Sequence, residues 1–139
     1  MMFASKLAAV INKTCEPGVA QNALAHMSFE LGQIVEKDKT LLCDYVDGDD
    51  TLHPAISSMP FIVLSANSNK IWAAVHVARE KNLLCVDFVD TMTGGAYLEQ
   101  LENTKNTAEE SLIYYGAVFF GPWDSVSELT KKFSLWRWA

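Results

Sequence analysis

The chain has 139 residues, with 17 acidic and 11 basic side chains and a formal net charge of −6. Half of the residues are hydrophobic and 20% are charged, which excludes a disordered acidic tail, and seven glycines with four prolines are too few for a low-complexity linker. We expect one domain over residues 1–139 that buries on the order of 70% of the surface of the unfolded chain. The acidic balance argues against nucleic acid as a partner, because proteins that bind the phosphate backbone use a positive field.

The cysteines and the N-terminus indicate the compartment. Cys15, Cys43 and Cys85 are odd in number and form no Cys-x-x-Cys pair, so neither a disulfide framework nor a metal ribbon is expected. The N-terminal apolar stretch contains Lys6 and is too short for a signal peptide, and no run approaches the roughly 20 residues of a membrane span. We therefore expect a cytoplasmic protein with reduced thiols and no membrane contact, in which Cys85 is a small core residue.

Apolar runs and amphipathic stretches alternate along the chain. Pro17 suits the first turn of a helix, and apolar residues at three- and four-residue steps continue this helix to Ile34. Asn67 or Ser68 can cap a second helix that ends near Lys81. Further helices are expected at residues 96–101 and 124–132, and strands at residues 7–11, 61–64, 83–89 and 112–120. The alternation predicts a layered α/β domain with helices on both faces of the sheet, and the aromatic tail at residues 133–138 is expected to add an edge strand or cover a neighbour.

Residues 41–54 predict a β-hairpin, because Asp47-Gly48 tolerates the positive φ of a tight turn. Four aspartates and a histidine gather here: Asp44, Asp47, Asp49, Asp50 and His53. Calcium loops need alternating oxygen ligands and a distant bidentate glutamate, and no second histidine stands at zinc-ligand spacing. We therefore interpret the segment as a solvated hairpin tip and expect no metal.

The loop after the third strand is the first candidate site, since ligands of open α/β sheets bind beyond the carboxyl ends of strands. Asp90 closes that strand, and Thr91, Thr93 and Gly94 follow. A carboxylate there can act as a base, orient a histidine or hold a cation, while the hydroxyls and glycine amides can meet an anion. The alternative, which the residues alone favour, is an aspartate that bonds the amides of residues 92 or 93, as in an Asx turn.

The start of the first helix is the second candidate site, because its free amides form a natural anion site. Asn22 and His26 are four residues apart and lie on one line of this helix. A histidine within reach of a carboxylate can be a general acid or base. The alternative, favoured while no partner is in view, is a histidine packed on the rim of the sheet.

The remaining sequence patterns predict neither a catalytic nucleophile nor a cofactor site. His76 stands in the middle of a helix beside apolar residues, and Ser57 and Ser58 lack the Gly-x-Ser-x-Gly elbow that exposes a nucleophile. No dinucleotide or phosphate-loop pattern occurs, so no cofactor is expected.

Several segments carry a resemblance to a known family: Asn12-Lys13, Pro17-Gly18-Val19-Ala20, Asn22-Ala23-Leu24-Ala25-His26, Asp44-Tyr45-Val46-Asp47, His53-Pro54-Ala55-Ile56-Ser57, Met59-Pro60, Val86-Asp87-Phe88-Val89-Asp90, Tyr115-Gly116-Ala117 and Gly121-Pro122. In order and spacing they resemble the domain-of-unknown-function two-thousand family, a group of uncharacterised, mostly bacterial proteins. That family resembles the type II peptidyl-tRNA hydrolases in fold. The resemblance implies a three-layer α/β/α domain with a four-stranded mixed sheet, and a homodimer.

The resemblance to those hydrolases also implies which site residues persist. Their aspartate after the third strand is matched by Asp90, and their first-helix histidine is matched by His26. The Arg-Thr pair that follows their aspartate corresponds to a position near Thr93-Gly94, so only the hydroxyl is kept, at a displaced position. Lys13 is expected to be near enough to compensate for lysines that those enzymes have and this chain lacks.

Two departures put the hydrolase activity in doubt. The lysines that those enzymes place at the start of the first helix and after the second core strand are Val19 and Ser65 in this chain. Such lysines attract an RNA phosphate and stabilise a developing oxyanion. Together with the net charge of −6, their replacement disfavours hydrolysis of peptidyl-tRNA.

Three functions therefore remain. The first is binding or hydrolysis of a small molecule, with Asp90, His26 and Thr93 as the catalytic candidates and Asn12, Lys13, Asn22, Thr91 and Gly94 as the binding candidates. The second is a non-catalytic, dimeric interaction protein with a large apolar interface at Trp123, Trp136 or Trp138. The third is a retained peptidyl-tRNA hydrolase.

Overall fold

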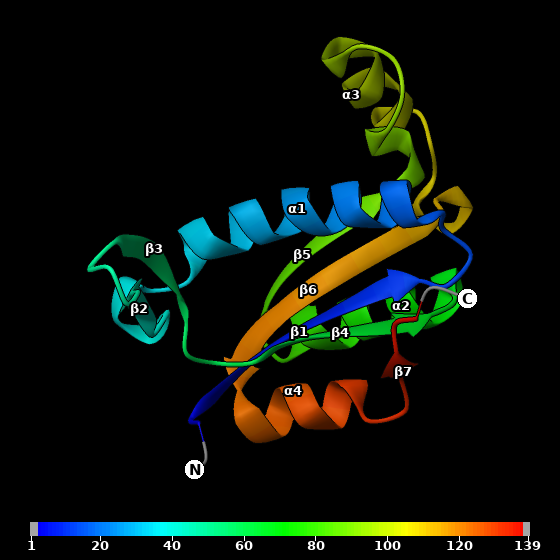
Figure 1. The fold of residues 1–139 in the computed structure, drawn as a ribbon. Coiled ribbons are helices and arrows are strands. Elements are labelled where there is room, and N and C mark those ends of the chain that lie inside the picture. Colours follow the sequence, from blue (N-terminus) through cyan, green and yellow to red (C-terminus); the bar gives the residue numbers. More distant parts are fainter. Residues whose placement is uncertain (1–2, 138–139) are drawn as a thin grey trace.

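The computed structural model describes residues 3–137, and a mixed five-stranded sheet forms its centre (Figure 1). Its strands are β1 (Ser5–Asn12), β4 (Phe61–Ala66), β5 (Leu84–Val89), β6 (Tyr114–Pro122) and β7 (Ser134–Leu135). They lie in the order β5-β6-β1-β4-β7; β1 is parallel to β4, and the other neighbours are antiparallel. The mixed α/β class predicted from the sequence is confirmed.

The predicted count of four strands is wrong. The apolar tail passes the free edge of β4, where Ser134 and Leu135 pair with Ser65 and Leu64 as a fifth strand. The Trp136 amide then donates to the Val63 carbonyl at 3.0 Å. Trp138 lies outside the described residues. The closer likeness to the fold of type II peptidyl-tRNA hydrolases stays a prediction.

Helices cover both faces of the sheet (Figure 1). Helix α1 (Pro17–Ile34) lies on one face, and α2 (Ser68–Glu80) and α4 (Trp123–Thr130) lie on the other. β1 is buried on both sides, because Ala9 and Ile11 belong to the core under α1 while Ala8 and Val10 belong to the core under α2 and α4. A strand covered on both faces reads as a continuous apolar run, which is why the sequence shows no alternation there.

The helix boundaries follow local signals. α1 begins at Pro17 and ends at Ile34 as predicted, and the Asn67 side chain caps α2 by accepting the Lys70 amide at 2.9 Å. α4 begins at Trp123, directly after Pro122, one residue before the predicted start.

The connection between β5 and β6, residues 90–113, forms what we call the arm. It contains the 3₁₀ turns η2 (Asp90–Met92) and η3 (Glu109–Ser111) and the helix α3 (Tyr97–Lys105), which extends past the predicted end at residue 101. α3 has no buried residue and stands away from the sheet beyond α1 (Figure 1).

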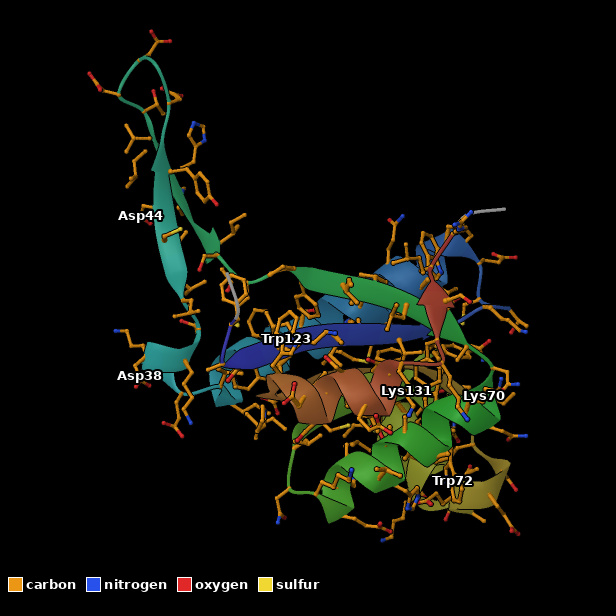
Figure 2. The ribbon with its side chains drawn as sticks, turned by 90° about the horizontal axis from the view of Figure 1, so that it is seen from below. Asp38, Asp44, Lys70, Trp72, Trp123 and Lys131 are labelled. Atoms are coloured by element: carbon orange, nitrogen blue, oxygen red, sulfur yellow. The ribbon has the colours of Figure 1, made fainter. Side chains whose placement is uncertain are left out.

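A β-hairpin forms a separate two-stranded sheet, made of β2 (Leu42–Val46) and β3 (Leu52–Ser57), after the short 3₁₀ turn η1 (Lys37–Lys39). The predicted tight turn at Asp47-Gly48 is wrong. The loop spans residues 47–51, and the positive φ, 63°, falls on Asp50. Figure 2 shows the hairpin extending away from the main sheet.

Two further findings bear on the expected environment. None of the helices within residues 3–137 combines the length and apolarity needed to cross a membrane. Cys85 packs against the core under α2, and burial raises the pKa of its thiol to about 12, which fits the predicted core position.

Gly116 is the position where the packing between β6 and α1 leaves least space. A Cβ there would lie 2.9 Å from the Val10 carbonyl oxygen and 2.9 Å from the Met27 methyl group. We expect Gly116→Ala to lower the free energy of unfolding by about 1–3 kcal/mol, measured by urea denaturation. Gly18→Ala is the control, because a Cβ at Gly18 meets nothing within 4 Å; equal losses in both variants would contradict the prediction.

Candidate functional site

A cleft of about 540 Å³ opens between α1 and the arm, along the edge strand β5. Its lining comes from α1 (Asn22, His26, Met27), from β5 (Val86, Asp87, Phe88) and from the arm (Met92, Thr93, Gly94, Tyr97, Gln100). The volume lies within the range of ordinary ligand pockets, about 300–1,000 Å³. The structure thus brings together four of the predicted site residues, which are Asn22, His26, Thr93 and Gly94.

His26 and Asn22 form the α1 wall of this cleft. Ala23 and Met27 turn inward to the core, which leaves the line through Asn22 and His26 facing the arm. The His26 ring lies over Phe88 with the ring centroids 5.9 Å apart, and within residues 3–137 it has no hydrogen-bond partner. Its nitrogens are therefore available to a ligand. The cleft meets α1 at its second and third turns rather than at its N-terminal amides.

The arm wall is shaped by a turn that only glycines adopt readily. Gly94 and Gly95 have φ values of 70° and 66° and redirect the chain from η2 into α3. The Gln100 side-chain amide donates to the Gly94 carbonyl at 3.1 Å, and the Thr93 hydroxyl donates to the Asp90 carbonyl at 2.9 Å. These bonds hold the arm wall in place.

Asp90 closes the base of the arm instead of lining the cleft. Its carboxylate accepts the Ile113 amide at 3.1 Å, and its own amide donates to the Ile113 carbonyl at 2.9 Å. The Thr93 amide bonds the main-chain carbonyl of Asp90, so the predicted Asx-type bond to the turn amides is made by the backbone. Asp90 therefore joins the two ends of the arm.

Tyr115 lies behind the cleft lining, packed on Phe88, and the sequence analysis did not predict this position. In the β5–β6 ladder Phe88 pairs with Gly116 and Val89 pairs with Tyr114, so Tyr115 is the extra residue of a β-bulge. The bulge turns its ring onto the α1 face, where it stacks on Phe88 with the centroids 6.4 Å apart.

The surroundings of the Tyr115 phenol connect it to the predicted site. Burial raises its pKa, the nearby Cys15 and Asp90 raise it further, and a hydrogen bond with Thr93 acts in the opposite direction. A local signal for the bulge is absent, because it arises from the pairing of two strands 25 residues apart.

Three predicted binding residues lie outside the cleft lining. Asn12 is buried, donates to the Tyr114 carbonyl at 2.9 Å and accepts the Thr14 amide at 2.9 Å, so its polar atoms are satisfied within the fold. Thr91 shares a hydrogen bond with Thr104 inside the arm, and Lys13 is exposed in the loop before α1.

Within the described residues, no three His, Cys, Asp or Glu side chains gather as a metal site.

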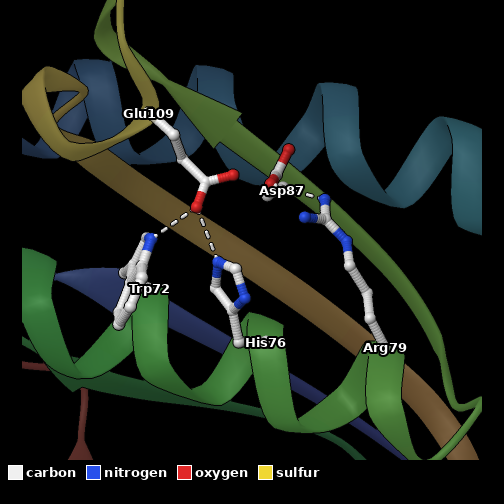
Figure 3. Close-up of polar contacts among 5 residues, drawn as sticks. All are labelled: Trp72, His76, Arg79, Asp87 and Glu109. Carbon is white, nitrogen blue, oxygen red and sulfur yellow. Dashed lines mark hydrogen bonds and ion pairs between the residues drawn. The ribbon is translucent and has the colours of Figure 1, made fainter.

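A polar cluster on the other face ties the arm to α2 (Figure 3). Glu109 Oε1 accepts the Trp72 indole N–H at 2.9 Å and lies 2.7 Å from His76 Nε2. The bonds from Trp72 and His76, in that order, hold the pKa of Glu109 below its ordinary value near 4.5. Beside this cluster, Arg79 donates to the Asp87 carboxylate at 3.1 Å. The arm that forms one wall of the cleft is therefore fastened at η3.

Comparisons with known proteins identify a family through one family model and a similar fold through one solved structure, and neither indicates an activity. A family model described as "Protein of unknown function (DUF2000)" matches residues 5–137. The fold is similar to that of a protein of unknown function, Atu0240, from Agrobacterium tumefaciens strain C58, with a TM-score of 0.81 and 15% identity over 98% of this chain and 100% of that one. No curated protein matches the sequence significantly.

The role of Asp90 at the base of the arm can be tested with two substitutions. Asp90→Asn keeps the Oδ1 acceptor for the Ile113 amide, whereas Asp90→Ala removes it. We expect Asp90→Ala to cost about 1 kcal/mol of unfolding free energy and Asp90→Asn to cost much less, measured by urea denaturation. Equal destabilisation by the two substitutions would show that this hydrogen bond does not hold the arm.

The cluster at Glu109 predicts a pH dependence. Because its pKa is lowered in the folded state, its contribution to stability is complete above about pH 4.5 and is lost as the pH falls through the lower, folded-state pKa. We expect Glu109→Gln to flatten the fall in melting temperature between about pH 6 and about pH 3. Glu110→Gln, on the next residue of η3, is the control, and an unchanged pH profile in Glu109→Gln would contradict the prediction.

Proposed function

The chain belongs to the DUF2000 family of proteins of unknown function, and we propose that its cleft between α1 and the arm binds a small, uncharged ligand with a flat apolar body. The observation that carries this proposal is the His26 ring, which lines the cleft, lies against Phe88 and has no hydrogen-bond partner within the described residues. A ring in this position can hydrogen-bond a ligand through its nitrogens while the ligand packs beside it.

The chemistry of the lining indicates the class of ligand. Val86, Phe88 and Met92 supply apolar surface, and Asn22 and Gln100 supply amides at the rim. The described lining contains no lysine or arginine, the side chains that recognise phosphate. A neutral ligand with hydrogen-bonding groups at its edge fits this lining better than an anion does.

The acid near the cleft is already engaged. The Asp87 carboxylate points to the α2 side, where it bonds Arg79. Its burial raises its pKa, and Arg79 opposes that shift. Because Arg79 already pairs with this carboxylate, a cationic ligand gains little from it.

Binding ranks before hydrolysis because His26 has no orienting carboxylate. A histidine that acts as a general base is normally held in one tautomer by a carboxylate or carbonyl. Within residues 3–137, no such bond to His26 is present, and the Asp90 carboxylate is bonded to Ile113. If the cleft hydrolyses its ligand, His26 is the group that moves the proton, and the Thr93 hydroxyl lies on the opposite wall.

Hydrolysis of peptidyl-tRNA has the weakest support of the three functions. Val19 stands at the first turn of α1, and Ser65 pairs with β7 at the covered edge of β4, so neither position supplies positive charge. With a net charge of −6, the chain repels an RNA backbone. Absence of tRNA binding in a titration at low salt would remove this function.

The second candidate function, a dimeric interaction protein, is favoured by a different observation. Large apolar side chains are exposed on the hairpin and on α3, with Leu98 74% exposed. Two of the three tryptophans predicted for that role are engaged within the chain: Trp123 stacks on Phe3, and Trp136 packs against the core under α1.

The cleft proposal is tested by thermal shift against a panel of neutral aromatic and amide-bearing metabolites. We expect at least one compound to stabilise the wild type, and we expect His26→Ala and Thr93→Val to reduce that stabilisation at least about tenfold in apparent affinity. Asp90→Asn, measured with the same compound, tests whether the charge at the base of the arm also contributes.

Gln21→Ala is the matched control, since Gln21 is exposed on the same helix and lies outside the cleft lining. A panel that shifts the wild type not at all, or a shift that His26→Ala leaves intact, would overturn the proposal.

A further inference from the structure

A groove of about 520 Å³ lies between α2 and the end of α4, on the face opposite the cleft. Its floor is apolar and is made of Ala73, Ala74, Val77, Leu129 and Phe133. Its rim carries four lysines and one glutamate, namely Lys70, Lys81, Lys131, Lys132 and Glu128. In a chain with 11 basic side chains and a net charge of −6, this groove is a local reversal of charge.

The positive charge of this rim is largely uncompensated. Lys131 pairs with Glu128 at 2.7 Å, whereas Lys70, Lys81 and Lys132 have no ion-pair partner within residues 3–137. Lys131 lowers the pKa of Glu128 most, and Lys81 and Lys132 lower it further. The three ammonium groups therefore lie near the same carboxylate. An apolar floor with a positive rim fits an acidic segment that also carries apolar side chains.

The hairpin of this chain has that composition at its tip. The Asp47 carboxylate accepts the amides of Asp49 and Thr51 at 2.9 and 3.0 Å and lies 2.8 Å from His53 Nε2. These bonds hold the loop in one conformation and leave Asp49 and Asp50 exposed at its end. The tip is a preorganised acidic projection, which lowers the entropy lost when it binds.

The hairpin carries an exposed apolar pair next to its tip. Val46 pairs with Leu52, so these two side chains share a face, and within residues 3–137 they are 61% and 57% exposed. A two-stranded hairpin in water is marginally stable unless its apolar face is packed. This face therefore favours a partner, and the pair nearest the acidic tip is Val46 with Leu52.

The groove and the hairpin lie at opposite ends of one molecule. In Figure 2 the hairpin, marked by Asp44, extends from one end, while Lys70 and Lys131 lie at the other end of the α2–α4 face. The hairpin of one chain does not reach its own groove, so its occupant comes from a second chain.

We propose that the hairpin tip of one copy docks in the α2–α4 groove of a second copy. Val46 and Leu52 pack on the floor at Ala73 and Val77, and the tip aspartates lie among the rim lysines. When two copies exchange hairpins about a two-fold axis, the contact forms twice and the assembly closes as a dimer. The proposal is independent of the ligand cleft, which lies on the other face of the sheet.

A charge-swap experiment tests the docking. In sedimentation velocity over a concentration series, we expect the wild type to dimerise. We expect the hairpin variant Asp49→Lys/Asp50→Lys and the groove variant Lys70→Glu/Lys132→Glu each to weaken self-association at least about tenfold. An equimolar mixture of these two variants restores opposite charges at both contacts, and we expect it to form the heterodimer.

The controls separate docking from folding and from net charge. Lys13→Glu/Lys105→Glu makes the same change of charge outside the groove, and we expect it to dimerise nearly as the wild type does. Circular dichroism checks that every variant is folded. A wild type that stays monomeric up to its solubility limit, self-association that neither swap weakens, or a mixture that does not associate would overturn the proposal.

Discussion

The burial of the central strands on both faces is the constraint on which the rest of the structure depends. β1 and β6 lie between two apolar cores, so that adjacent residues such as Val118 and Phe119 are buried on opposite sides. A polar side chain in this region is favourable only when its hydrogen bonds are made inside the protein, as they are for Asn12. Polar groups that meet a ligand are therefore supplied by the exposed side of α1 and by the arm, while the edge strand β5 contributes mainly apolar surface to the cleft.

The bulge at Tyr115 shows how the sheet supplies a polar side chain without breaking this rule. In a regular ladder Tyr115 would face α2, like its neighbours at alternate positions. The extra residue turns its ring to the α1 face beside Phe88, while Tyr114 remains buried on the other side. His26, Phe88 and Tyr115 thus form a row of rings from α1 to the base of the arm. His26 and Phe88 expose part of this row to the cleft, and Tyr115 supports Phe88 from behind.

The features that were predictable from the sequence are those with local causes. Pro17 at the start of α1, the Asn67 cap of α2 and the continuous apolar run of β1 depend on residues within a few positions of each other. The aromatic tail is expected from the sequence to add an edge strand or cover a neighbour, and β7 confirms the edge strand, although its partner β4 was not predictable. The bulge depends on pairing between distant segments, and no local pattern records that pairing. The candidate site divides in the same way. Asn22 and His26 share a helix face by their spacing, but whether a loop residue reaches them depends on the turn of the arm at Gly94.

The net charge of −6 has a different meaning once the positions of the charged side chains in the structure are known. As a sum it argues against binding to a nucleic acid, because the whole surface of such a partner is negative. It does not argue against association with a second copy, since a partner of the same composition carries both signs. Asp49 and Asp50 lie on the hairpin and the rim lysines lie at the other end of the molecule, so two identical chains present opposite charges when the hairpin of one faces the groove of the other. Separation of charge along a molecule in this way selects an orientation of approach more than it adds affinity. The acidic residues that disfavour binding to a nucleic acid thus also favour one orientation of a second copy of the chain.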